Sequence, residues 1–373
     1  MNKFYFLKIR GKRFLKILFW IGLCLPYNLL AQEPTGYYDA ALGKKDKDLK
    51  TALFKIIRPH KQLNYLALPT AFQSTDWHPA TSTSPKGYYW DMYSSNQHST
   101  WSKQELNREH NMPKSWFGVS SDQVNDFQIS TDLNNLYPSD INANSAKLNY
   151  ALGVVSNSAI FSNGVVKVGS NSFPGYNGTV FEPANEYKGD FARDYMYMVT
   201  CYEDYANTWQ SIGTSSMLIR GSYYPVLNAY AVNLLLQWHR QDAVSSKEVT
   251  RNNAVYSLQN NRNPYIDYPV LAEYIWGKFI GETWDGSNDD PENNSPLKAL
   301  YSATDKSVFV SIKNPQAAFY SIFSVFGMLK QSGEISETSK ISLNKENKIF
   351  DKGIYLIVVY TGNYRKSTRF LVY

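Results

Sequence analysis

Cysteine is nearly absent from this sequence of 373 residues, which contains only Cys24 and Cys201. Cys24 lies in an apolar N-terminal stretch that we expect to be removed, so the mature chain would keep one cysteine and could form no internal disulfide. Cys201 follows Tyr195, Met196 and Val199 in a helical pattern, which predicts a small buried side chain rather than a catalytic thiol. The mature fold must therefore be stabilised by its core, helped by any metal ion that binds the folded form.

Histidine is also scarce, with only five residues, at positions 60, 78, 98, 110 and 239. The sequence contains no His-Glu-x-x-His motif, and the spacing of the five histidines does not match a zinc site. These absences argue against a zinc metalloprotease.

The first 31 residues have the pattern of a secretory signal peptide. Six cations precede a mostly apolar run from 17 to 30, and a small residue, Ala31, follows it. A charged start, an apolar centre and a small residue at the cleavage point define such a signal. Pro26 and Asn28 interrupt the run, which is shorter than the roughly 18 residues that a membrane span prefers. We expect export through the periplasm to a secreted or cell-surface location, with no stable membrane span after cleavage.

The net charge says little about the partner of the mature protein. The whole chain carries a formal charge of +6, and the leader alone contributes six cations and no acid. Its removal leaves the mature chain near neutral. Any binding of phosphate groups must therefore come from local clusters of cations rather than from the overall field.

Hydrophobic periodicity divides the first 285 residues into helical and strand-rich parts. The i, i+3, i+4 spacing of apolar residues predicts helices at 49–57, 144–153, 189–202, 226–239 and 247–258. A strand is expected to end at 88–93, and short strands joined by turns are expected between 153 and 183.

The composition changes behind residue 285. Residues 286–296 read GSNDDPENNSP, a polar and acidic stretch typical of a linker, which we place at 286–298. Segments at 307–312, 318–323, 354–359 and 368–373 then predict a small all-β module at 299–373. Its Phe326-Gly327 turn, its strand entry at 352–355 and its apolar last strand resemble the C-terminal sorting domains of the type IX secretion system. That resemblance implies the secretion machinery as a partner.

The stretch from Asn107 to Phe117 concentrates the chemistry of the chain. It contains Arg108, Glu109, His110 and Lys114 and ends in large aromatic residues. A carboxylate, an imidazole and two cations this close together suit a site where a metal, a base and a polyanion meet. Adjacent residues of a strand point to opposite sides, so Glu109 and His110 share a site only if the backbone bends or the substrate straddles the strand.

A second stretch begins at Asn135-Leu136-Tyr137-Pro138 and continues through Asn144, Lys147, Asn149 and Tyr150. It offers an amide oxygen, which hard metal ions accept as a ligand, followed by further polar groups at helical spacing. This stretch could supply the second half of a metal site.

In this order, the two stretches resemble the secreted endonuclease I family, whose core is a strand-strand-helix metal site of the His-Me finger type. Members share Arg-Glu-His followed by Pro-Lys-Ser-Trp-Phe, and Asn-Leu-Tyr-Pro-Ser followed by an asparagine and a basic residue before Asn-Tyr. This chain has both. Further matching segments lie between residues 37 and 276, at 90–93, 189–193, 236–239 and 261–267. The resemblance implies an α+β fold, with a ββα-metal core in a mostly helical scaffold at 32–285 and the small all-β domain behind it.

The resemblance also implies roles for individual residues. His110 would be the general base, and Glu109 with Asn144 would hold Mg²⁺, with Mn²⁺ or Ca²⁺ as alternatives. Arg108, Lys114, Lys147 and Asn149 would contact the substrate, although a solvated surface charge is an equally good interpretation for the three cations.

Some relatives place an arginine between the two motifs to steady the scissile phosphate, but 119–134 contains no arginine or lysine here. That role would fall to Lys114, Arg251 or Arg262, or to no residue. The arginines at 193, 251 and 262 could equally be buried partners of nearby acids.

The function that follows is a secreted, metal-dependent endonuclease that hydrolyses DNA, with RNA as a further substrate. No recognition-helix module is present, so we expect no marked preference for base sequence. The 29 tyrosines and 9 tryptophans keep a second class open, a surface-displayed glycan- or peptide-binding module without catalysis. A phosphodiesterase for small nucleotides is a closer alternative.

Overall fold

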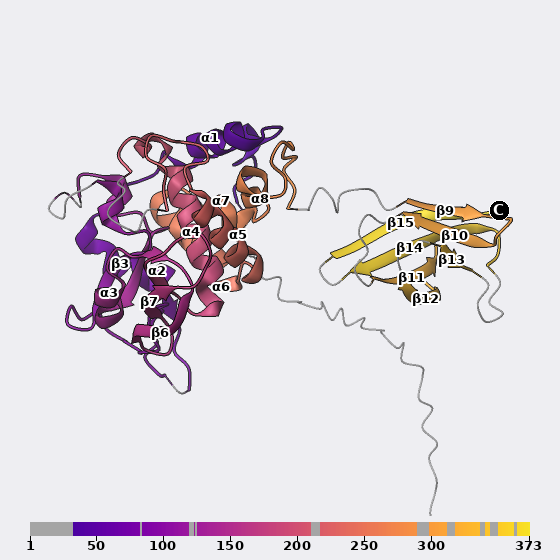
Figure 1. The fold of residues 1–373 in the computed structure, drawn as a ribbon. Helices are drawn as coiled ribbons and strands as arrows, with labels where there is room; N and C mark the ends of the chain where they lie inside the picture. Colours follow the sequence, from indigo (N-terminus) through magenta and orange to yellow (C-terminus); the bar gives the residue numbers. More distant parts are fainter. Residues whose placement is uncertain are drawn as a thin grey trace, which may run out of the picture.

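The computed structural model describes residues 33–82, 84–118, 123, 125–209, 217–288, 298–311, 318–335, 340–343, 350–361 and 364–373 (Figure 1). The expected signal peptide at 1–31 and most of the expected linker lie outside these residues. Within the described ranges, every helix is too short or too polar to cross a membrane.

The helical part is organised around α4 (Lys188–Cys201), which is buried along its length from Gly189 onward. It packs against α1 (Asp46–Ile57), α5 (Ala229–Gln241) and α7 (Pro264–Asp267), and Figure 1 shows it in the middle of these helices. Two more helices, α6 (Ser246–Gln259) and α8 (Leu271–Trp276), complete this layer. The helices expected at 49–57, 189–202, 226–239 and 247–258 are confirmed.

Local capping explains where these helices begin. The Asn228 side chain accepts a hydrogen bond from the Ala231 amide and starts α5 three residues later than the periodicity predicts. Ser245 and Glu248 form a capping box at the start of α6. Helix α2 (Leu68–Thr75) was not predicted, because turn residues and aromatics around it hide a helix of only eight residues.

Two small sheets lie beside this layer. Strand β1 (Trp77–His78) pairs with β2 (Tyr88–Tyr89), and a four-stranded sheet has the order β5-β8-β7-β6. Its strands are β5 (Ala151–Leu152), β6 (Val155–Ser162), β7 (Lys167–Asn171) and β8 (Thr179–Glu182), as expected for 153–183. The strand expected up to residue 93 ends at Tyr89, because the Asp91 carboxylate accepts hydrogen bonds from the Tyr93 amide and the Ser94 hydroxyl and forms a turn.

The two sequence stretches meet in a separate unit of two strands and a helix. Strand β3 (Leu106–His110) pairs antiparallel with β4 (Leu136–Asp140), and α3 (Ile141–Lys147) follows β4 directly and packs against both strands. The expected helix at 144–153 is wrong in both bounds. The Asp140 carboxylate caps the helix at its start, and Leu148 ends it by adopting a left-handed φ of 48°.

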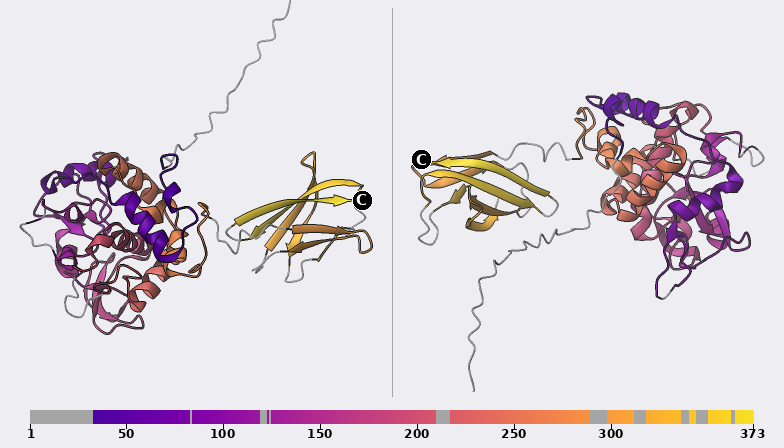
Figure 2. Two further views of the ribbon diagram at one scale, coloured as in Figure 1. Left: turned by 90° about the horizontal axis from the view of Figure 1, so that it is seen from above. Right: turned by 180° about the vertical axis from the view of Figure 1, so that it is seen from behind.

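Every described element between 298 and 373 is a strand. One sheet has the order β13-β10-β9 and the other β12-β11-β14-β15, and residues of both contribute to one buried apolar cluster, so the sheets pack face to face (Figure 2). The strands are β9 (Lys298–Ser302), β10 (Ser307–Ser311), β11 (Ala318–Ser324), β12 (Leu329–Ile335), β13 (Lys340–Ser342), β14 (Gly353–Thr361) and β15 (Tyr364–Val372). Strands β10, β11, β14 and β15 occur where the sequence predicts them.

Candidate active site

Strand β3 sends the side chains of the Arg-Glu-His motif to two opposite sides. The His110 ring lies parallel to the Tyr65 ring, with 6.5 Å between centroids, and the Arg108 guanidinium carbon lies 4.2 Å from the centroid of the same Tyr65 ring. Glu109 points the other way, where its Oε1 is 2.7 Å from Lys147 Nζ on α3. The register with β4 is continuous to His110, so β3 does not bend between the two residues. A shared substrate must therefore reach both sides of the strand.

His110 is held in one tautomer by a main-chain oxygen. Its Nε2 lies 3.0 Å from the carbonyl oxygen of Ser130, and a carbonyl can only accept a hydrogen bond. Nε2 must therefore carry the ring proton, and Nδ1 keeps its lone pair. In the described part of the chain, no group hydrogen-bonds to Nδ1. The imidazole thus presents an unprotonated nitrogen of the kind that a general base needs.

The surroundings keep this imidazole neutral. Burial lowers the pKa of His110 to about 3, and the positive charges of Lys114, Lys147 and Arg108 act in the same direction. The Phe117 ring meets His110 edge-on, with 6.1 Å between centroids, so aromatic rings contact the imidazole from two elements.

The chain is fixed immediately after His110 by asparagine side chains. Asn135 accepts from the Met112 amide at 2.7 Å and donates to the Met112 carbonyl at 3.1 Å, in the manner of a paired strand. Asn111 donates to Asp194 of α4 at 2.7 Å. Sequence reasoning did not assign either asparagine side chain the role of fixing the chain after His110, although their positions beside His110 and at the start of the second stretch were a usable signal.

The loop that supplies the Ser130 carbonyl is anchored through Asp132. One carboxylate oxygen accepts from the hydroxyls of Tyr197 and Tyr202, at 2.7 and 2.9 Å, and the other accepts from the Gln259 amide at 2.6 Å. Tyr197 and Tyr202 lie on or next to the buried helix α4, and Gln259 is a buried residue at the end of α6. The scaffold thereby fixes the position of the oxygen that sets the His110 tautomer.

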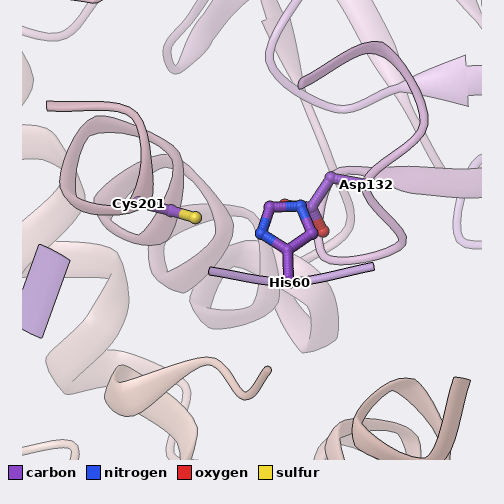
Figure 3. A group of neighbouring side chains, drawn as sticks. All are labelled: His60, Asp132 and Cys201. Carbon is purple, nitrogen blue, oxygen red and sulfur yellow. The ribbon is translucent and has the colours of Figure 1, made fainter. Parts of the chain in front are cut away.

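Asp132 also belongs to a buried group that could hold a metal ion, formed with His60 and Cys201 (Figure 3). The ligand atoms of the three residues lie within 4.8 Å of one another. Each of them is engaged in a hydrogen bond. His60 donates from Nδ1 to a carbonyl at 2.9 Å and has its Nε2 3.2 Å from the Tyr202 hydroxyl, and Cys201 Sγ lies 3.6 Å from another carbonyl. Burial raises the pKa of the thiol, so an ion would have to displace these bonds and a proton.

Helix α3 places Lys147 against the Glu109 carboxylate of β3. Lys147 is completely buried, and its Nζ donates to Glu109 Oε1 at 2.7 Å and to the His110 carbonyl at 3.0 Å. Asn144 precedes Lys147 by three residues and therefore lies on the same face of α3, toward β3. Burial raises the pKa of Glu109, and the charge of Lys147 opposes that shift.

The donor set at this point fits a hard divalent cation. A carboxylate and an amide both bind through oxygen, which Mg²⁺, Mn²⁺ and Ca²⁺ prefer. Lys147 is the only side chain hydrogen-bonded to Glu109 in the described ranges, so further carboxylate lone pairs remain for a cation.

The cations expected to contact the substrate occupy different environments. Lys147 does not face solvent, because it is buried and its ammonium is paired with Glu109. Lys114 is half-buried in the short turn Lys114–Phe117, and Asn149 is half-buried beyond the end of α3. Arg108 shares its side of β3 with His110.

The two distant arginines are bound in the scaffold. Arg251 pairs with Asp76 at 2.8 Å and lies 3.8 Å from the centroid of the Tyr137 ring, and Arg262 pairs with Asp267 at 2.7 Å. Both are buried. They have the structural role that the sequence left as an alternative. Arg251 reaches β4, where it donates to the Leu136 carbonyl at 2.8 Å, and its pairing with Asp76 holds it there.

Known proteins match the part of the chain that carries this site. The model of the endonuclease I family matches residues 46–270, more than half of the chain. This chain is 34% identical to the extracellular ribonuclease of Bacillus amyloliquefaciens and 32% identical to that of Bacillus subtilis (strain 168). Both alignments extend over 243 residues, which are 64% of this chain and 78% of each relative. Site and comparisons together define a nuclease that acts on phosphodiester bonds. The chain belongs to the endonuclease I family, whose members are generally metal-dependent.

Proposed function

We propose that this protein is a secreted endonuclease that hydrolyses DNA and RNA without marked preference for base sequence, with His110 as general base. The observation that carries the proposal is the hydrogen bond between His110 Nε2 and the Ser130 carbonyl, which leaves Nδ1 as an acceptor. The antiparallel pair β3 and β4, followed directly by α3, supports our assignment of a His-Me finger core.

The proposed reaction is attack by water on phosphorus. The water oxygen forms a bond to phosphorus while one of its protons passes to His110 Nδ1. The bond from phosphorus to the leaving sugar oxygen breaks, and that oxygen takes up a proton from a solvent water and leaves as a hydroxyl. A positioned base of this kind contributes roughly 10²- to 10⁴-fold to the rate. With a pKa of about 3 in the free protein, His110 is a weak base, but a phosphodiester anion placed beside it would raise that pKa.

Glu109 and Asn144 are the proposed ligands of a Mg²⁺ ion. When bound, the ion would supply charge relief at the phosphoryl oxygens and at the leaving oxygen. Lys147 keeps the Glu109 side chain in place and compensates its charge inside the protein. In this proposal Lys147 acts on Glu109, the metal-binding residue, and its ammonium does not contact the substrate.

Water as the nucleophile makes the sugar hydroxyl dispensable, so one site can act on both nucleic acids. The names of the two Bacillus relatives support RNA as a substrate. The test uses RNA oligonucleotides with a single 2′-deoxy substitution at each position in turn, alongside DNA of the same sequence. Cleavage at the deoxy positions, with phosphomonoester products, is the expected result. Cyclic phosphate products and a block at every deoxy position would contradict attack by water.

Secretion is proposed from the composition of the first 31 residues and from the word extracellular in the names of both relatives. The strands β9–β15 are proposed to serve as a sorting domain for the secretion machinery. Deletion of 296–373 is then expected to leave active enzyme in the periplasm of the producing cell. Release of the truncated protein at the normal rate would remove the sorting role and leave the nuclease assignment untouched.

A further inference from the structure

Arg108 is placed to act on the same part of the substrate as His110. The two residues are separated by one position on β3 and therefore lie on the same side of the strand, toward Tyr65. The Arg108 guanidinium lies over the Tyr65 ring, at 4.2 Å from its centroid, and donates to the Tyr65 carbonyl at 3.2 Å. The His110 ring is nearly parallel to the Tyr65 ring, at an angle of 12°. One tyrosine thus packs against both the base and the cation.

Among the described residues, Arg108 also has no carboxylate counter-ion, unlike most of the arginines that the structure describes. Carboxylates lie within 4.0 Å of the arginines at 58, 193, 240, 251 and 262. Within the described ranges, no carboxylate is that close to Arg108. Among the residues that the structure describes, its buried Nε has no hydrogen-bond partner. A buried N–H of a charged group that lacks a partner is costly, which indicates that a ligand completes the site.

We propose that Arg108 contacts the scissile phosphate and that Tyr65 is a positioning residue that holds the guanidinium beside His110. This inference rests on the proposed phosphodiester hydrolysis. Residues 119–134 contain no cation that could steady the scissile phosphate. In this proposal, Arg108 on β3 has that role. An anion between Arg108 and His110 would satisfy the Nε–H and would bring phosphorus to the side of β3 on which Nδ1 accepts a proton.

The Tyr65 ring explains how Arg108 can remain in place without a carboxylate partner before substrate binds. The face of a tyrosine ring attracts a guanidinium but leaves its N–H edge available, whereas a carboxylate would occupy that edge. A ring also restricts the rotamers of the long side chain, so less freedom is lost when the phosphate binds. Tyr65 itself is fixed by its position in the short turn Tyr65–Ala67. The Asn64 side chain accepts from the Leu66 amide there, and the Tyr65 amide donates to the Asn125 side chain.

The test compares Arg108→Met with Arg220→Met, a matched variant of an exposed arginine that lacks a carboxylate partner within the described ranges. Cleavage of a fluorogenic oligonucleotide and binding of the same sequence in chelator are measured for both. Arg108→Met is expected to lose about 100-fold in kcat, and the slope of log Kd against log salt is expected to fall by about one. Arg220→Met is expected to match the wild type.

Three further variants separate positioning from folding. Arg108→Ala is expected to regain activity when methylguanidinium is added, which a purely structural arginine would not show. Tyr65→Phe keeps the ring and is expected to retain near-wild-type kcat. Tyr65→Leu removes the ring and is expected to have a much lower kcat, with little change in circular dichroism. An Arg108→Met enzyme as active as Arg220→Met, or an Arg108→Ala enzyme without rescue, would overturn the inference. Because wild-type cleavage is measured in parallel, failure of the proposed function would be seen separately, as an inactive wild type.

Discussion

The ammonium nitrogen of Lys147 lies 2.7 Å from Oε1 of Glu109, and both side chains are buried where α3 packs against β3. A buried carboxylate needs a cation, because the charged form is expensive to desolvate. Without a metal ion, Lys147 serves as that cation. A metal ion on Glu109 and Asn144 would then share the carboxylate with Lys147, which links metal binding to the stability of this unit.

Replacement of Lys147 by methionine tests this relationship. Loss of one partner from a buried ion pair costs about 3–5 kcal/mol, so we expect the free energy of unfolding in chelator to fall by that amount. Because Glu109 is then without a cation, added Mn²⁺ should raise the Tm more in Lys147→Met than in the wild type. The double variant with Glu109→Gln serves as the control and should recover part of the loss. A Lys147→Met protein with wild-type stability and an unchanged response to Mn²⁺ would contradict the pairing.

The tautomer of His110 can be observed directly. The Ser130 carbonyl requires a proton on Nε2, and burial keeps the ring neutral with a pKa of about 3. Long-range ¹H–¹⁵N spectra at pH 7 should therefore show a neutral imidazole with the proton on Nε2, assigned by comparison with His110→Gln. A proton on Nδ1, or an imidazolium at this pH, would rule out the arrangement from which the general base is inferred.

His239 makes the stability depend on pH. Burial, together with the charge of Arg193, lowers its pKa to about 4, compared with about 6.5 in the unfolded chain. Below pH 6.5 the unfolded state binds a proton that the folded state does not, so stability falls as the pH decreases toward 4, by about 1.4 kcal/mol per unit. His239→Gln should show a shallower decrease in urea unfolding across this window, with His98→Gln as the matched control. Equal slopes in all three proteins would show that His239 does not contribute.

The group formed by His60, Asp132 and Cys201 is expected to be filled by hydrogen bonds rather than by an ion. Cys201→Ala should therefore leave the metal content of the purified protein unchanged, as measured by mass spectrometry of the elements, and Co²⁺ should produce no thiolate absorption band. A decrease of one zinc per chain in Cys201→Ala would identify the group as a structural metal site.

Local patterns in the sequence were sufficient for the long elements. The apolar spacing around Tyr195 and Met196 predicts α4, and strand alternation correctly separates Glu109 from His110. The start of α3 was missed because it depends on the Asp140 cap and not on apolar spacing. Its end was missed because the sequence does not reveal that Leu148 adopts a left-handed conformation.

The contacts that define the site were beyond the reach of sequence patterns. Lys147 and Glu109 are 38 positions apart, and only the packing of α3 on β3 brings them together. The partner of His110 is a main-chain oxygen, and every residue type carries one, so Ser130 left no signature in the sequence. The pairing of Arg251 with Asp76 joins residues 175 positions apart, whereas that of Arg262 with Asp267 is local and was foreseeable.

The most direct test of the central claim is plasmid cleavage by the mature protein and by its His110→Ala variant, each with Mg²⁺ and with a chelator. The account predicts that only the wild type with Mg²⁺ cuts, and that the control variant His98→Ala cuts like the wild type. If His110→Ala cuts as fast as the wild type, His110 is not the base, and the assignment of this site to phosphodiester hydrolysis fails.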